Sequence, residues 1–109
     1  MNYLRNSVSL IGNLGKDVDF KELESGTTLA RVSLATKDVY KNQKGEKVVE
    51  TQWHNLIGWD KIAQRMQVFL KKGKQIAVSG KLIHRTYQDK EGTTKYRSEI
   101  IVRDFMLLG

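Results

Sequence analysis

The chain has 109 residues, a formal net charge of +7 and no cysteine. This length allows one domain with a single core, and the lack of cysteine excludes disulfides and thiolate metal sites. No run of about 18 apolar residues occurs, so we expect no membrane-spanning segment. The basic balance favours a polyanionic partner, either nucleic acid or an anionic membrane surface.

The excess of positive over negative charge is confined to one part of the chain. Residues 1–36 hold four basic and four acidic side chains, whereas residues 37–103 hold fifteen basic and seven acidic ones. Flat aromatic side chains lie in the same basic part, at Tyr40, Trp53, Trp59 and Tyr87. Rings stack on unpaired bases and cations bind phosphates, so the combination is typical of a groove for single-stranded nucleic acid.

The first half of the sequence predicts three strands. Residues 6–11 alternate small polar and apolar side chains, the period of a half-buried strand, and the glycines and asparagine of 12–15 are expected to end it. A second strand is expected over 28–40 and a third over 48–59. Residues 41–47 are polar and contain a glycine, which predicts a hairpin loop between these strands.

A helix is predicted directly after the third strand. Asp60 is a suitable N-cap. Lys71 and Lys72 suit the last turn, and Gly73 suits the C-terminal stop. The polar face of this helix is too weakly basic for binding to a membrane surface, which leaves nucleic acid as the favoured partner. Apolar residues recur behind the cap at helical spacing: Ile62, Ala63, Met66, Phe69 and Leu70.

Two more strands are predicted, over 75–87 and 95–107, with a polar loop at 88–94. The order is therefore three strands, one helix and two strands. This order is typical of the OB-fold, a five-stranded Greek-key barrel with one α-helix between strands three and four. We predict an all-β protein of this class, in which residues 1–109 form one domain.

Short segments resemble, in unbroken order, the motifs of bacterial single-stranded DNA-binding proteins. Each motif alone is weak, but the ordered set is specific and covers nearly the whole chain. The segments are Val8–Asp17 (opening strand and turn), Ala30–Thr36 (second strand), Glu50–His54 (the T-x-W-H signature), Phe69–Gly73, Val78–Leu82 (the V-x-G-x-L strand) and Asp104–Met106 (end of the barrel).

The resemblance implies an OB-fold that forms a homotetramer and is wrapped by single-stranded DNA during replication, repair and recombination. It also implies a cytoplasmic, nucleoid-associated protein. Family members usually continue into a linker and an acidic tail that recruits replication and repair proteins. The present sequence stops at Gly109 without such a tail, which fits a natural tailless variant, a processed chain or a shortened one. If the tail is absent from the protein itself, we do not expect recruitment by that route.

The resemblance places the family's stacking positions on Tyr40, Trp53, Trp59 and Tyr87. The spacing of six puts the two tryptophans on one face of a regular strand, which leaves open whether that face is core or binding surface. The two tyrosines lie beside polar loops, where exposure is expected. Weaker stacking candidates are Tyr96 and Tyr3. The phenylalanines are expected to pack inside the protein: Phe20, Phe69 and Phe105.

Basic residues are candidates for phosphate contacts, although any one of them could belong to an ordinary solvated surface. Lys41 and Arg85 neighbour two of the proposed stacking rings. Phosphate contacts release counterions, so affinity should fall with salt, and stacking predicts weak sequence preference. The candidates are Arg31, Lys37, Lys41, Lys61, Lys72, Lys74, Lys81, Arg85 and Arg97.

An oligomer interface is expected on the first strand, where Ser7 and Ser9 give a face of short side chains on which another subunit could pack. His54 directly follows Trp53 and so points to the other side of its strand. In the family, the histidine at this position lies near the subunit interface. We expect an interface role for His54 and no metal site.

Other functions fit the sequence less well than single-strand binding. A dimeric OB-fold interaction module of the primosome type would carry fewer stacking aromatics, and an RNA-binding OB domain is a further alternative. A zinc deaminase needs cysteine ligands, and a metal nuclease needs clustered carboxylates, whereas the acidic residues here are scattered. We therefore predict a non-catalytic protein without a cofactor.

Overall fold

The computed structural model describes residues 4–109, which form six strands and one helix. The predicted strands and helix are all present. The elements in chain order are β1 (Val8–Leu14), β2 (Asp19–Glu22), β3 (Thr28–Lys41), β4 (Lys47–Trp59), α1 (Lys61–Phe69), β5 (Gln75–Gln88) and β6 (Thr94–Leu107).

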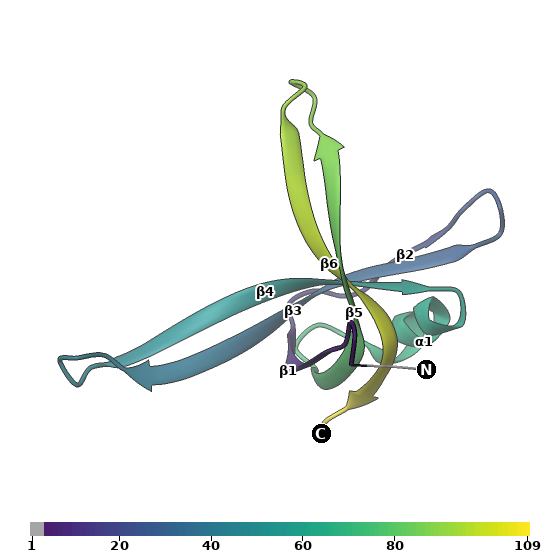
Figure 1. Cartoon of the computed structure of the whole chain (residues 1–109). Coiled ribbons are helices and arrows are strands. Elements are labelled where there is room, and N and C mark those ends of the chain that lie inside the picture. The colour runs from purple at the N-terminus through teal and green to yellow at the C-terminus, as the bar shows by residue number, and fades with distance from the viewer. Residues whose placement is uncertain (1–3) are drawn as a thin grey trace.

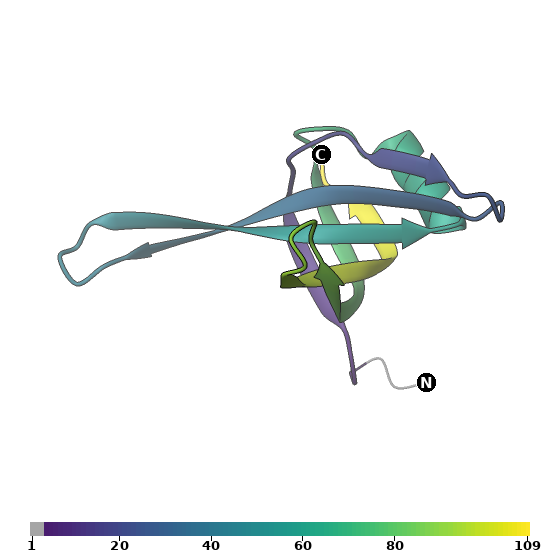
Figure 2. The same ribbon diagram turned by 90° about the horizontal axis from the view of Figure 1, so that it is seen from above.

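The strands make one sheet in the order β1-β5-β6-β4-β3-β2, and a further pairing of β1 with β3 closes it into a barrel (Figure 1). Neighbouring strands are antiparallel except β4 and β6, which run parallel. The view from above shows β3 and β4 crossing the barrel (Figure 2). This is the five-stranded closed barrel of the OB-fold, so the predicted fold class is confirmed.

The short strand β2 is an element that the sequence analysis did not predict. Its four residues are mostly polar and show no alternation in burial, and they become a strand only by pairing with residues 28–31 of β3. Because β2 precedes β3, α1 follows the fourth strand of the chain instead of the third.

The core fills the barrel and the space beneath α1. Leu34, Leu56 and Ile76 are at most 1 % exposed, and α1 adds the fully buried Ala63 and Met66. Burial of these side chains supplies the main favourable free energy of folding. The helix therefore closes one end of the barrel.

The phenylalanines do not all pack as expected. Phe105 is buried and Phe20 is partly buried against the core, but Phe69 is 50 % exposed. Successive helical residues are rotated by about 100°, which places Phe69 at the edge of the apolar arc, beside the partly buried Ile62. The expectation for Phe69 was wrong because the buried arc is narrower than the apolar pattern.

The first strand continues past the predicted stop, through Gly12 to Leu14. A Cβ atom on Gly12 would lie 2.2 Å from the carbonyl oxygen of Ala35 in β3. Glycine at this position therefore permits the close approach of β1 and β3 that closes the barrel. Gly80 has the same relation to the carbonyl oxygen of Ile101, also at 2.2 Å, beside a bulge in β5.

The start of α1 is not capped as predicted. Asp60 has a φ of 53°, and its side chain makes no capping hydrogen bond within residues 4–109. Its carboxylate instead accepts a hydrogen bond from the backbone N–H of Thr28 at 3.4 Å, and its carbonyl accepts one from the Thr28 hydroxyl at 3.2 Å. These two hydrogen bonds join the start of the helix to β3.

The end of α1 also falls earlier than predicted. The helix ends at Phe69, so Lys71 and Lys72 follow it, and Gly73 (φ 86°) lies in the loop before β5. Lys71 still donates a hydrogen bond from its ammonium group to the carbonyl of Gln67, at 3.4 Å. This contact satisfies a carbonyl of the last turn. No helix in residues 4–109 is long and apolar enough to cross a membrane.

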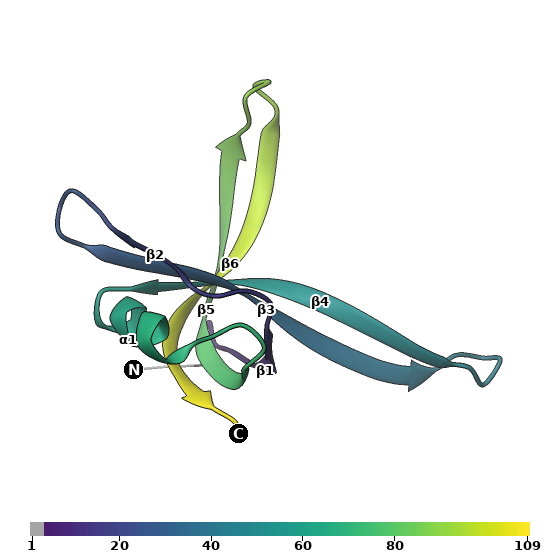
Figure 3. The same ribbon diagram turned by 180° about the vertical axis from the view of Figure 1, so that it is seen from behind.

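Two hairpins extend from the barrel as arms that diverge from each other (Figure 3). The β3–β4 arm is paired out to Lys41 and Lys47, and the β5–β6 arm out to Gln88 and Thr94. Both predicted hairpin loops are therefore confirmed.

Candidate nucleic-acid interface

The outer face of β3 and β4 carries both tryptophans. Trp53 pairs with Ala35, Arg31 with Ile57 and Trp59 with Leu29, and alternation puts the side chains of these pairs on one face. The prediction that the tryptophans share a face is therefore confirmed. Trp53 is 61 % exposed and Trp59 is partly buried, so the ring of Trp53 is available to a ligand.

The indole of Trp53 lies over Gly15, in the segment that follows β1. A Cβ atom built on Gly15 would lie 2.5 Å from the Trp53 ring. Gly15 therefore provides a flat surface against which the ring can lie, and the segment after β1 contributes to the position of a proposed stacking residue.

Gly15→Ala is expected to push the Trp53 ring out of place without unfolding the barrel, because Gly15 does not have a positive φ. The resulting loss of single-strand affinity should not exceed that of removing the ring, about 1–3 kcal/mol. Titration with labelled oligo-dT measures the loss. The double variant with Trp53→Ala should lose no more than Trp53→Ala alone, and additive losses would refute a shared effect.

The β5–β6 arm has one face that combines cations with an aromatic ring. Lys81, Arg85 and Tyr87 share a face of β5 by alternation, and Arg97 is paired with Arg85. The guanidinium of Arg97 lies 5.9 Å from the centre of the Tyr87 ring, a cation–π distance. Tyr87 is 49 % exposed, as expected for a residue beside a polar loop.

Tyr96 lies on the other face of the same arm. It is paired with Thr86, next to the pair of Tyr87 with Lys95, so alternation directs it away from Tyr87. Tyr96 is 81 % exposed but stands apart from the arginines. The other weak candidate, Tyr3, lies outside the described residues.

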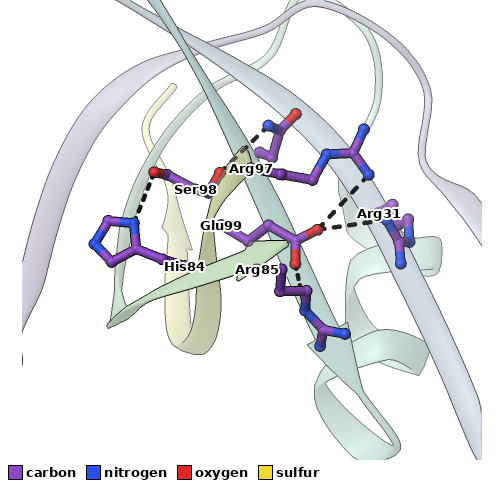
Figure 4. A network of polar contacts seen from close by, with 7 residues as sticks. Arg31, His84, Arg85, Arg97, Ser98 and Glu99 are labelled. Carbon is purple, nitrogen blue, oxygen red and sulfur yellow. Dashed lines mark hydrogen bonds and ion pairs between the residues drawn. The ribbon is translucent and has the colours of Figure 1, made fainter. Parts of the chain in front are cut away.

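In the part of the chain that the structure describes, three arginines surround the buried carboxylate of Glu99 (Figure 4). Arg85 Nε lies 2.7 Å from Oε1, Arg31 Nη1 lies 3.4 Å from Oε2, and Arg97 Nη1 lies 4.0 Å from Oε2. Glu99 itself is 1 % exposed. This cluster, the Glu99 cluster, brings together three of the predicted phosphate-binding residues from β3, β5 and β6.

A cavity of about 260 Å³ adjoins the Glu99 cluster. It lies between the loop after β1 and the outer face of β3 and β4. Its lining includes Lys16, Arg31, Asn55, Arg97 and Glu99. Asp17 and Asp19 line it as well, so the cavity brings together groups of both charges beside Arg31 and Asn55, which lie on the outer face that carries Trp53.

Tyr40 stands apart from the tryptophans. Its pairing with Val48 puts it on the face of β3 that carries Leu34 and Thr36 nearer the barrel. Tyr40 is 45 % exposed, and its hydroxyl donates a hydrogen bond to the Glu50 carboxylate at 2.8 Å. This hydrogen bond, followed by the negative charge of Glu50, raises the pKa of Tyr40 above its ordinary value of 10.0.

Glu50→Ala should return the pKa of Tyr40 toward its ordinary value. The neutral phenol is favoured in the folded state, so the contact stabilises the fold below the ordinary pKa of 10.0 and is lost as pH rises through the raised value. The ultraviolet absorbance of tyrosinate follows the titration, and Tyr40→Phe identifies which step belongs to Tyr40. Identical titrations of Glu50→Ala and the unaltered protein would contradict the assignment.

The remaining predicted cations fall into two groups. Lys37 and Lys41 share the outer face of β3 with Arg31 by alternation and are exposed. Lys61 begins α1, and Lys72 and Lys74 lie in the loop behind it, where the backbone N–H of Lys72 donates to the Asp17 carboxylate at 2.8 Å. Neither group belongs to the Glu99 cluster.

The predicted interface residues lie in two places. His54 is partly buried, and its Nε2 lies 2.9 Å from Thr36 Oγ1 in the same chain. Ser7 is exposed just before β1, and Ser9 lines a shallow apolar hollow on the outer face of β1, β5 and β6. Ile11 and Met106, 60 % and 64 % exposed, line the same hollow.

Two candidate functional residues were not found from the sequence. Glu99 stands two positions after Arg97 and therefore shares its face of the strand, which is the signal that could have found it. Gly15 was interpreted only as a strand breaker. Nothing local to Gly15 indicates its contact with Trp53.

A closed OB barrel with an exposed tryptophan and an arginine cluster on its outer surface is an arrangement typical of nucleic-acid-binding OB-fold proteins. Residues 5–108 match the sequence profile of the Single-strand binding protein family. The chain therefore belongs to that family.

Individual relatives agree with this assignment. Single-stranded DNA-binding protein 1 of Xylella fastidiosa (strain 9a5c) is 41 % identical over 105 residues, covering 95 % of this chain and 77 % of that protein. Single-stranded DNA-binding protein 1 of Chlorobaculum tepidum is 38 % identical over 105 residues, but this chain spans only 65 % of its length. The solved structure of the Plasmodium falciparum SSB complex with ssDNA is 30 % identical, with a TM-score of 0.87 and coverage of 95 % of both chains.

Proposed function

We propose that this protein binds single-stranded DNA with little sequence preference and has no catalytic role. The observation that carries the proposal is the placement of an exposed Trp53 and the Glu99 cluster on the outer surface of one OB barrel, in a chain of the Single-strand binding protein family. Bound strand could neither re-pair nor fold back. This protection would serve replication, repair and recombination of nucleoid DNA in the cytoplasm.

The proposed path of the strand follows the named side chains. Bases stack on Trp59 and Trp53 along β4, the arginines of the Glu99 cluster hold phosphates, and Tyr87 stacks a base on the β5–β6 arm. Stacking on aromatic residues is worth about 1–3 kcal/mol per base in single-strand-binding proteins. Tyr40 belongs to this path only if the strand continues to the end of the β3–β4 arm.

Quenching of tryptophan fluorescence by oligo-dT, with duplex DNA as the control, tests the proposal. We expect strong quenching by the single strand, little by the duplex, and an affinity that falls linearly with salt on logarithmic axes. Equal binding of duplex and single strand, or no quenching at low salt, would refute single-strand binding and favour a protein-interaction module.

We also propose that the protein assembles as a homotetramer. Among the described strands, β1 pairs with β3 only at Asn13 and Leu14, so its edge over residues 8–12 is open to another strand. The adjoining hollow with Ser9, Ile11 and Met106 offers an apolar surface, and Ser7 and His54 are the further interface candidates. Light scattering should report the mass of four chains, and the mass of one chain would contradict assembly.

A further inference from the structure

Glu99 occupies a fixed place at the root of the β5–β6 arm. Its backbone is paired with Ile83 of β5 on one side and with Asn55 of β4 on the other. Pairing on both sides fixes the backbone of Glu99, so the point from which its side chain extends cannot shift. The arginines around it have long side chains that are 43 %, 51 % and 45 % exposed for Arg31, Arg85 and Arg97.

The Glu99 cluster is poorly suited to a purely stabilising role. Burial of a carboxylate is costly, and an apolar side chain of similar size often serves the fold equally well. Within residues 4–109, Oε1 of Glu99 accepts no hydrogen bond of good geometry, although Arg85 Nε is 2.7 Å away. The contacts with Oε2 are longer, at 3.4 Å and 4.0 Å.

We propose that Glu99 is a positioning residue that holds the guanidinium groups of Arg31, Arg85 and Arg97 ready for phosphates of a bound strand. This inference rests on the proposed single-strand binding. Each guanidinium has five N–H donors in a planar fork, so a contact with Glu99 leaves other donors facing outward. Without the central negative charge, the three positive groups repel one another and must be ordered anew when a strand binds.

The alternative is that Glu99 only subtracts one unit of positive charge from the binding surface. The two hypotheses predict effects of opposite sign when the carboxylate is replaced by an amide of the same shape. A positioning residue makes Glu99→Gln bind more weakly, whereas a merely opposing charge makes it bind more tightly.

The test compares Glu99→Gln with Glu24→Gln, the same change of charge at an exposed residue in the β2–β3 turn. Binding of labelled oligo-dT is measured by anisotropy over a range of salt. We expect Glu99→Gln to lose affinity by about tenfold, comparable to one charge-assisted hydrogen bond. Its salt slope should shrink by about 0.7 for each phosphate that the arginines no longer bind, while Glu24→Gln leaves both unchanged.

Affinity of Glu99→Gln equal to or above that of the unaltered protein would overturn the proposal. A change in melting temperature without a change in salt slope would also overturn it, because that is the result expected of a purely structural ion pair. Failure of the unaltered protein to prefer single strand over duplex would instead refute the proposed function.

Arg85→Lys gives a second test from the other side of the contact, and its overturning outcome does not require Glu99→Gln to fold. Lysine keeps the charge but lacks the planar fork and the Nε group that contacts Glu99. Weaker binding by Arg85→Lys, with no further loss in the double variant with Glu99→Gln, supports the proposal. Unaltered affinity of Arg85→Lys would overturn it.

Discussion

Trp53→Ala is expected to weaken oligo-dT binding by about 1–3 kcal/mol, roughly 5- to 150-fold, the range found when a stacking ring is removed. The side chain is 61 % exposed and lies over Gly15 outside the core. The variant should therefore fold with nearly the same melting temperature. Anisotropy of a labelled oligonucleotide measures the affinity, and circular dichroism checks the fold.

Tyr96→Ala is the matched control for Trp53→Ala. Tyr96 is an even more exposed ring, at 81 %, but it lies on the face of the β5–β6 arm that points away from Tyr87 and the Glu99 cluster. Its removal should leave affinity unchanged. A folded Trp53→Ala variant with unaltered affinity would show that the strand does not run over the outer face of β4.

Gly12→Ala is expected to destabilise the barrel, because the new Cβ atom would lie 2.2 Å from a backbone oxygen of β3. Backbone cannot move aside as a flexible side chain can, so β1 and β3 must separate. Overpacking of this kind costs about 1–3 kcal/mol or more, and each kcal/mol lowers the melting temperature of a domain of this size by roughly 4–8 °C. Thermal unfolding followed by circular dichroism measures the shift.

Ser9→Ala serves as the control for Gly12→Ala, since it adds no bulk at an exposed position of the same strand. Its melting temperature should stay close to that of the unaltered protein. If Gly12→Ala also melts at the unaltered temperature, the close approach of β1 and β3 does not limit the closure of the barrel.

Much of the fold was predictable because it depends on local patterns. The long strands β3, β4, β5 and β6 contain alternating or β-branched residues between polar loops, and their predicted bounds agree with the structure to within a residue or so. The helix was found from its apolar spacing. Asp60 stands at the N-cap position, as predicted, but it makes no capping hydrogen bond. Its carboxylate instead accepts from Thr28, a residue 32 positions away, and no pattern around position 60 indicates that contact.

The candidate site was predictable only as a list of residue types. The shared face of Trp53 and Trp59 followed from their even spacing along one strand. The grouping of Arg31, Arg85 and Arg97 did not, because Arg31 and Glu99 lie 68 positions apart and meet only after the barrel closes. The same limit applies to Gly15, whose contact with Trp53 depends on the path of β1.

The order of the five barrel strands and the helix, the OB-fold and the concentration of rings and cations in one part of the chain were all predictable from the sequence, since alternation, helical spacing and composition are local properties. The folded barrel alone shows which of these side chains lie together. It places Tyr40 and Tyr96 apart from the other rings and buries Glu99 among three arginines. It also shows that Gly12, which was expected to end the first strand, lies where β1 and β3 approach each other closely. Strand register and barrel closure set those contacts, and both arise from long-range pairing.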